Sequence, residues 1–196
     1  DVFGLIRGAL PRLGKLALLH DPRAFAWRGR PLPEVGQRPP SRLERVRQAA
    51  ARLGIELMEV SIAAPGEAYA AARKALTSAD ALFISVDAVV VLGSTGALRA
   101  AMEARKPAFG GLESLVRQGA LGAVVPSPAR LGTVGARVAH AALLGASLAA
   151  TVAPEASEIA INQRAADVLG VRLPARLLER AVRVYEAIEE PSSANA

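Results

Sequence analysis

The sequence contains no cysteine, which excludes disulfides, thiolate catalysis and cysteine-ligated metals. It also lacks the common catalytic and phosphate-binding motifs: there is no Walker loop, no G-x-G-x-x-G, no G-x-S-x-G elbow and no H-E-x-x-H. Arg, Asp or Glu interrupts every apolar run before it reaches the length of a membrane span. These absences predict a protein that holds no metal and no cofactor.

A block of like charge is missing as well. The formal net charge of +6 comes from 24 basic and 18 acidic residues, and the basic residues, nearly all Arg, are scattered along the chain. A nucleic-acid-binding surface gathers its basic residues in one region, so we expect no nucleic-acid partner. The N-terminal residues do not combine a basic segment with a long apolar stretch, and we expect any export signal to lie outside this chain.

The sequence does contain enough apolar material for one large core. With 52% hydrophobic residues and long Ala-rich segments, it predicts a single α/β domain over residues 1–196. The central stretch, Ala79–Gly111, changes its period along its length. Ala81–Val86 is typical of a buried strand, the segment from about Ser94 has helical spacing, and Ala108–Phe109 is a second short strand.

A strand, a helix and a strand in this order form a right-handed crossover between parallel strands. The carboxyl ends of parallel neighbours meet at one edge of the sheet, which is the usual place for a ligand in open α/β folds. We therefore expect Asp87 and the segment Gly110–Glu113 to lie side by side on that edge.

Strands and helices alternate through most of the remaining chain, which predicts an open doubly wound parallel sheet with helices on both faces. The other expected strands are Lys15–His20, Ile55–Ile62, Leu121–Val125 and Glu158–Ile161. The expected helices are Val2–Leu10, one that begins at a capping box on Ser41, Ala68–Leu76, Leu131–Leu144, one between Asn162 and Leu169, and Leu177–Ile188, with a long loop over Pro22–Pro40.

Polar residues at the strand ends have both structural and functional interpretations. Asp87 follows a buried strand directly, where a carboxylate caps the next helix, is solvated or binds a cationic group. Glu113 either hydrogen-bonds a ligand amine or caps the turn that follows its strand. Ser127 stands between two prolines, as a hinge contact or as a plain loop residue. His20 and Asp21 could form a catalytic pair, but the sequence offers them no recognisable third partner.

Short motifs follow one another in a characteristic order along the chain. They are Leu10-Pro11, His20-Asp21-Pro22, Ala51-Arg52-Leu53-Gly54-Ile55, Asp80-Ala81-Leu82-Phe83 leading to Asp87, Lys106-Pro107-Ala108-Phe109-Gly110, Arg117-Gln118-Gly119-Ala120-Leu121, Leu131-Gly132, Leu144-Gly145, Ile161-Asn162 and Leu169-Gly170. Over nearly the whole chain, this order resembles the second half of the ABC-transporter substrate-binding proteins of the periplasmic-binding-protein type I fold.

The resemblance implies two α/β lobes joined by a hinge, with a small molecule held between them and no chemistry performed on it. It also implies that the loaded protein docks on an ABC permease at the periplasmic or extracellular face of the membrane. Residues 126–150 would then form a crossing and a helix that pack on the first lobe, which is missing here, or on a second copy of the chain. The ligand-binding residues implied by position are Asp21, Asp87, Gly110, Gly111, Glu113 and Ser127.

Departures from the family's pattern make the expected cleft more apolar. Ala88 and Val89 replace polar residues expected just after Asp87, and Leu112 replaces an acid expected before Glu113. We therefore expect a small apolar or aromatic amino-acid-like ligand rather than a sugar.

Two other hypotheses remain open at this point. One is a small flavodoxin-like or isomerase-like enzyme that uses His20, Asp21 and Asp87. The other is an interaction module that forms a dimer through the Leu131–Leu144 helix.

Overall fold

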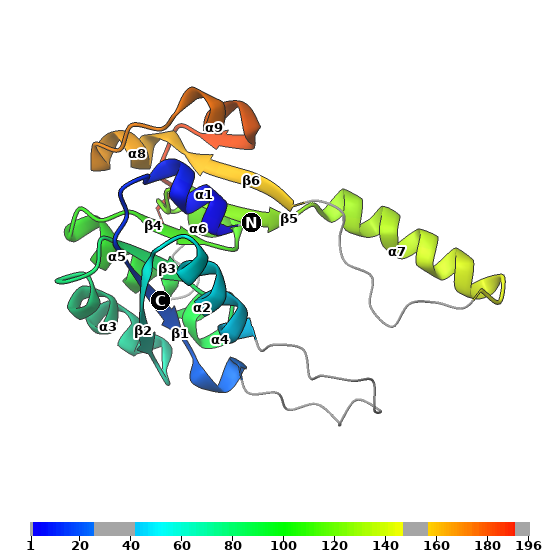
Figure 1. Ribbon diagram of the computed structural model, residues 1–196, viewed down its shortest axis with the longest axis horizontal. Coiled ribbons are helices and arrows are strands. Elements are labelled where there is room, and N and C mark those ends of the chain that lie inside the picture. The colour runs from blue at the N-terminus through cyan, green and yellow to red at the C-terminus, as the bar shows by residue number, and fades with distance from the viewer. Residues whose placement is uncertain (1, 26–41, 147–156, 191–196) are drawn as a thin grey trace.

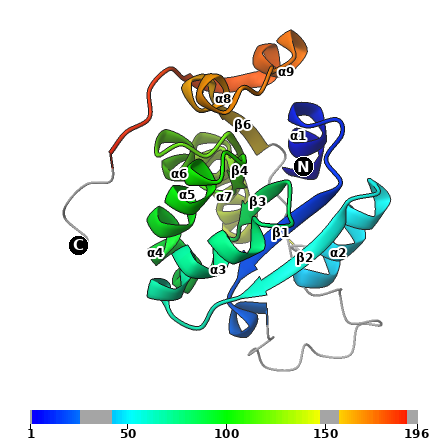
Figure 2. The same ribbon diagram turned by 90° about the vertical axis from the view of Figure 1, so that its left-hand side faces the viewer.

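The computed structural model describes residues 2–25, 42–146 and 157–190. Within these residues, a seven-stranded sheet has the strand order β2-β1-β3-β4-β5-β6-β7 (Figure 1 and Figure 2). The strands are β1 (Lys15–His20), β2 (Glu56–Ser61), β3 (Ala81–Ile84), β4 (Ala108–Gly110), β5 (Gly122–Pro126), β6 (Ser157–Asn162) and β7 (Ala181–Tyr185).

Most of the sheet is parallel, which confirms the predicted α/β fold class. The strands from β2 to β5 are parallel to their neighbours, whereas β6 runs antiparallel to β5 and β7 runs parallel to β6. The reversal of β6 follows from the place where the chain re-enters the sheet. Ser157 pairs with Pro126 at the carboxyl end of β5, so β6 has to run back toward the amino end.

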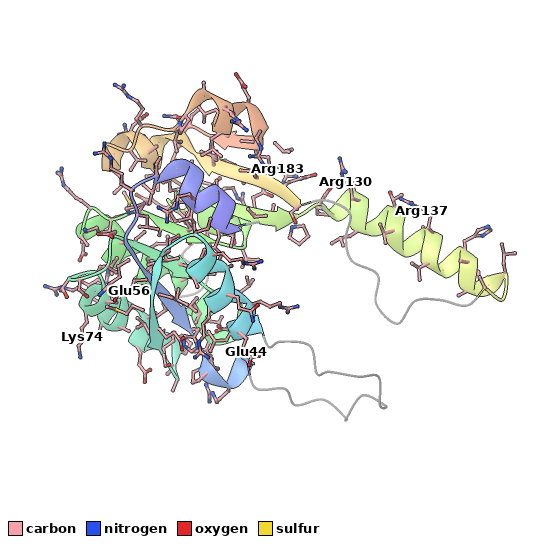
Figure 3. The ribbon with its side chains drawn as sticks, in the orientation of Figure 1. Glu44, Glu56, Lys74, Arg130, Arg137 and Arg183 are labelled. Carbon is pink, nitrogen blue, oxygen red and sulfur yellow. The ribbon has the colours of Figure 1, made fainter. Side chains whose placement is uncertain are left out.

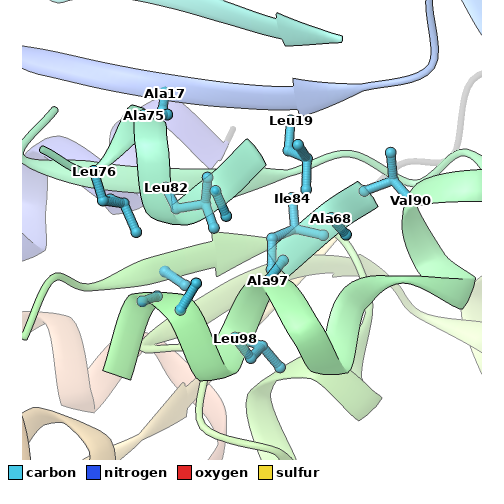
Figure 4. Packing of buried hydrophobic residues seen from close by; sticks show 14 of the residues in the cluster. Ala17, Leu19, Ala68, Ala75, Leu76, Leu82, Ile84, Val90, Ala97 and Leu98 are labelled. Atoms are coloured by element: carbon cyan, nitrogen blue, oxygen red, sulfur yellow. The ribbon is translucent and has the colours of Figure 1, made fainter. Parts of the chain in front are cut away.

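Helices cover both faces of the sheet because successive strand side chains point to opposite faces. On β1, Ala17 and Leu19 belong to the core beneath α3, α4 and α5 (Figure 4), and Leu16 and Leu18 belong to the core beneath α1 and α2. The described helices are α1 (Val2–Ala9), η1 (Pro22–Phe25), α2 (Arg42–Arg52), η2 (Pro65–Glu67), α3 (Ala68–Ala75), α4 (Ala88–Leu92), α5 (Ser94–Glu103), α6 (Glu113–Arg117), α7 (Pro128–Leu143), α8 (Gln163–Leu169) and α9 (Ala175–Arg180).

Helix α7 confirms the helix expected over Leu131–Leu144, and it extends away from the sheet (Figure 1). None of its residues is buried, and Leu143 is 86% exposed. Figure 3 shows Arg130 and Arg137 along its length. No helix in the described ranges is both long enough and apolar enough to cross a bilayer.

The helix predicted over Leu177–Ile188 is wrong in its second half. Helix α9 ends at Arg180, and the next five residues form β7. The sequence of β7, AVRVY, alternates along a strand: Val182 and Val184 are exposed, whereas Arg183 and Tyr185 are half-buried. Strand β6 offers an edge for pairing, and pairing with it outweighs the helical continuation that the sequence predicts.

Other predictions differ in smaller ways or fall outside the described residues. The central crossover contains an extra short helix, α4, before α5. The capping box at Ser41 lies outside the described residues, as does the Pro22–Pro40 loop beyond η1.

Asn162 joins three parts of the fold and is completely buried. It caps α8, because its Oδ1 accepts the Ala165 N–H at 2.8 Å, and Gly170 ends the helix at φ 68°. Its Nδ2 donates to the carbonyls of Val116 at 2.7 Å and Ala187 at 2.9 Å. One side chain therefore ties β6, α6 and the segment after β7 together.

We expect Asn162→Ala to lower the free energy of unfolding by about 3 kcal/mol, because it removes a helix cap and two buried donors. Asn162→Asp keeps the cap but loses both donors, so it should lower the free energy of unfolding by at least about half as much as Asn162→Ala. Urea unfolding followed by circular dichroism measures both. Gln163→Ala, which removes only an exposed bond to Asp167, is the control and should cost less than about 0.5 kcal/mol. Equal losses in Asn162→Ala and the control would contradict this role.

Candidate functional site

The candidate site lies where β1, β3 and β4 end. The register pairs Leu19 with Ile84 and Ile84 with Gly110, so the three carboxyl ends are neighbours. A Cβ on Gly111 would come within 2.6 Å of Val86 Cγ2. The corner at Asp87 and the corner at Gly110–Glu113 are therefore adjacent, as the crossover predicted. We call this edge the carboxyl rim.

Asp87 is buried, and three donors hold its carboxylate. Ser85 Oγ donates to Oδ2, the Asp21 N–H donates to Oδ2 at 3.1 Å, and the Val90 N–H donates to Oδ1 at 3.0 Å. Asp87 thus caps α4, one of the interpretations that the sequence left open, and it also joins the end of β1 to the end of β3. Because all three donors belong to the protein, the negative charge of the Asp87 carboxylate is stabilised within the rim.

Asp21 forms an ion pair with Arg23 of η1. The Arg23 Nε lies 2.9 Å from Asp21 Oδ1, and Arg23 Nη2 also donates to the Ala63 carbonyl at 2.8 Å. The hydrogen bond from Arg23 lowers the pKa of Asp21 below its usual value. The neighbouring His20 is buried, with its Nε2 3.4 Å from Ser61 Oγ. These contacts fasten the end of β1 to the chain that follows β2.

Glu113, the first residue of α6, contacts strand β7. Its carboxylate accepts hydrogen bonds from Arg183 and from the Tyr185 hydroxyl, and Arg183 (Figure 3) also faces Glu158 at 3.9 Å. Burial, together with the bond to Glu113, raises the pKa of Tyr185. Sequence reasoning missed both partners, because this segment was expected to continue the terminal helix. The alternation of AVRVY was the signal that could have revealed a strand.

Gly110 and Ser127 have local structural roles in the same region. A Cβ on Gly110 would come within 2.5 Å of Leu115 Cδ1, so a larger residue there would force the Leu115 side chain of α6 to shift. Ser127 is buried, and its Oγ accepts the Arg130 N–H at 3.5 Å, which caps α7. The crossing from β5 into α7 therefore begins at a capped helix end.

The rim exposes apolar surface and backbone groups, whereas its carboxylates are held by partners within the protein. Val86, which follows β3, is 44% exposed beside Gly111. No group of three His, Asp or Glu residues in the described part of the chain could hold a metal ion. Two concavities in the described residues lie at the opposite edge of the sheet. The rim is thus suited to form one wall against a ligand that another surface must enclose. A ligand-binding role for Asp21, Asp87, Gly110, Gly111, Glu113 and Ser127 stays a prediction.

Comparison with protein families gives a match over most of the chain. The model of the family described as ABC transporter substrate binding protein matches residues 38–185. No curated protein sequence matches the chain.

Solved structures share this fold. A conserved domain protein from Vibrio cholerae O1 biovar El Tor strain N16961 has a TM-score of 0.72 at 25% identity, covering 92% of this chain and 58% of that one. An ABC domain in complex with L-Trp from Streptococcus pneumoniae has a TM-score of 0.72 at 18% identity, covering 93% and 58%. A ligand-free, open substrate-binding protein with adhesive properties from Clostridium difficile has a TM-score of 0.70 at 17% identity, again covering 93% and 58%. The chain therefore spans 58% of the length of each of these proteins.

We expect Asp87→Ala to lower the free energy of unfolding by about 3 kcal/mol, because it leaves buried donors from β1, β3 and α4 without an acceptor. Chemical unfolding of the two proteins in parallel measures the loss. Asp167→Ala is the matched control, because among the described residues that exposed carboxylate on α8 accepts a hydrogen bond only from Gln163. An Asp87→Ala protein as stable as the control would show that the three bonds contribute nothing.

We also expect Arg23→Gln to raise the pKa of Asp21 toward its ordinary value of about 3.9. A carboxyl group with a lowered folded pKa adds stability above its unfolded pKa and loses that stability as the pH falls through the folded pKa. In Arg23→Gln this acid-sensitive contribution should shrink. A carboxyl-detected NMR titration measures the pKa, with Arg73→Gln on α3 as the control. An unchanged Asp21 titration in Arg23→Gln would contradict the assignment.

Proposed function

The chain belongs to the family of ABC transporter substrate-binding proteins, and from this premise we propose that it is a ligand-binding lobe of a solute receptor for an ABC importer. The observation that carries the proposal is the family match over residues 38–185, which includes every described strand except β1 and, on the carboxyl rim, the ends of β3 and β4. In open α/β sheets, ligands bind outside the carboxyl ends of the strands. The proposed binding wall is therefore the rim around Asp87 and Gly110–Glu113.

The proposed ligand is a small apolar or aromatic amino-acid-like molecule. Two observations support this choice. The exposed rim presents Val86 and the backbone around Gly111, whereas the carboxylates of Asp87 and Glu113 are held by partners within the protein. A structurally similar domain was solved in complex with L-Trp. A rim of this kind favours apolar contact with a side chain and backbone hydrogen bonds to the ligand's polar groups.

The proposed architecture is a two-lobed receptor in which this chain supplies one lobe. The chain spans 58% of the length of each structural relative described above. Helix α7 has no buried residue, and Leu131 on it is 42% exposed. A 16-residue helix gains little stability without packing, so a surface to cover it is expected. We assign that surface to the first lobe, which the crossing at Pro126 and α7 would contact. Residues 147–150 of the predicted 126–150 segment lie outside the described residues. A second copy of this chain is the alternative.

The proposed role involves binding without chemistry, which is typical of the family. The acids that the enzyme hypothesis needs have structural partners: Asp87 caps α4 and Asp21 pairs with Arg23. His20 is buried beside Ser61 instead of facing an open site. Members of the family act outside the cytoplasmic membrane, and we propose that this protein delivers its solute to an ABC permease at the periplasmic or extracellular face.

Ligand binding by the full-length gene product tests the proposal. We expect L-tryptophan, L-phenylalanine or a related amino acid to raise the thermal unfolding midpoint, and a sugar such as glucose to leave it unchanged. Stabilisation by none of these ligands, together with turnover of any of them, would favour the enzyme hypothesis. A concentration-dependent dimer in analytical ultracentrifugation without ligand binding would favour the interaction module.

A pair of exposed valines locates the binding wall. Val86 on the rim is 44% exposed, and Val168 on α8, at the other edge of the sheet, is 42% exposed. We expect Val86→Asp to weaken binding of the ligand found above at least about tenfold, because it places a charge against an apolar ligand. Val168→Asp should leave affinity unchanged. Isothermal titration calorimetry measures both, and equal affinities in the two variants would place the ligand elsewhere.

A further inference from the structure

A second concave surface lies at the amino edge of the sheet, opposite the carboxyl rim. It has a volume of about 500 Å³. Its walls come from the end of α1, the residues just before β1, β3 and β4, and the chain after α8. The lining residues are Ala9, Leu10, Pro11, Arg12, Leu13, Asp80, Pro107, Gly170, Val171 and Arg172. An adjoining concavity of about 410 Å³ shares Gly170, Val171 and Arg172 with it. The two together form a groove around the end of α8, which we call the amino-edge groove.

Two guanidinium groups of the amino-edge groove are available to a ligand. Arg12 and Arg172 are exposed, and within the described residues neither forms an ion pair or a hydrogen bond with another protein group. Other arginines on the surface do find partners, as Arg47 does with Glu59 at 2.6 Å. Arg12 and Arg172 line the same concavity, so an anion that enters it faces a lining that carries two guanidinium groups.

The acids of the groove already have donors. Asp80 Oδ2 accepts the Gly14 N–H at 3.1 Å and the Lys15 N–H at 2.8 Å, which fixes the carboxylate to the start of β1. The larger concavity, with two arginines and one aspartate, keeps a net positive charge. The adjoining concavity adds Asp167, whose carboxylate accepts a hydrogen bond from Gln163 at 2.9 Å.

The remaining walls are apolar. Leu13 and Pro107 are buried beneath the groove, and Leu10 and Val171 are half-buried at its sides. A guanidinium matches a carboxylate through two parallel N–H donors, and apolar walls stabilise a hydrocarbon group by removing it from water.

From this combination we propose that the amino-edge groove binds a small apolar carboxylate. The hydrocarbon part packs against Leu10 and Val171, and the carboxylate lies between Arg12 and Arg172. The chemistry is shared by a free organic acid and by the carboxyl terminus of an apolar peptide. The groove and the rim lie at opposite edges of the sheet, so this site does not depend on the solute-binding role proposed above.

NMR titration of the full chain with sodium octanoate tests the site. The backbone amides of Leu13, Gly170 and Val171 are expected to shift with a common saturation curve. Arg12→Gln and Arg172→Gln should each weaken the affinity about threefold, and the double variant about tenfold, as expected for solvent-exposed ion pairs. Arg73→Gln, which removes an exposed arginine on α3 away from the groove, is the control and should bind octanoate with unchanged affinity.

Four comparisons decide the outcome. Octanamide, the uncharged analogue, should bind at least about tenfold more weakly, because it cannot form the charged pairs. Equal binding of octanoate and octanamide, or octanoate affinity unchanged in the double arginine variant, would overturn the proposal. Shifts confined to Val86 and Gly111 would also overturn it, by placing the acid on the rim. A tetra-alanine peptide that binds with a free carboxyl terminus, but not as its amide, would support the site and assign it to chain termini.

Discussion

The geometry of the carboxyl rim depends on one buried carboxylate. Asp87 is removed from water, and an ionised carboxylate in that position is costly unless several donors satisfy it. The donors come from the residue after β3, from the first turn of α4 and from the chain that leaves β1. Satisfying one charge therefore fixes the relative positions of two strand ends and one helix. The carboxylate oxygens of Asp87 accept hydrogen bonds from groups inside the protein. The outward surface of the rim presents Val86 and the backbone near Gly111.

A second carboxylate extends this arrangement to the far end of the sheet. Glu113 stands at the end of β4, yet its partners are Arg183 and Tyr185 on β7. The C-terminal strand thus supports a corner of the rim from across the sheet. A substitution in β7 can change the rim without touching any residue on it, because the position of Glu113 depends on both donors.

The sequence was informative where the determining contacts are local. The spacing of apolar residues predicted β1, β3 and α5, and the capping of α4 by Asp87 was among its open interpretations, because Asp87 and Val90 are three residues apart. The contacts of Glu113 cross 70 residues or more of chain, and no local pattern carries them. The direction of β6 was equally inaccessible, since it depends on the edge at which the chain returns to the sheet. The helical spacing continued into β7, where pairing with β6 decided the outcome.

The pairing of Pro126 with Ser157 brings the departure and the return of the chain to one point on the sheet. The residues between Pro126 and Ser157, which include α7, form an excursion from the sheet. The pairing of β5 with β6 holds the two ends of this excursion together. Closing a longer or shorter loop between fixed ends changes the free energy only slowly with its length. Insertions, deletions and wholesale replacement within the excursion can therefore accumulate without shifting the register of β5 and β6. The length of this segment can therefore be adapted to the surface that covers α7 while the paired ends of β5 and β6 keep their positions.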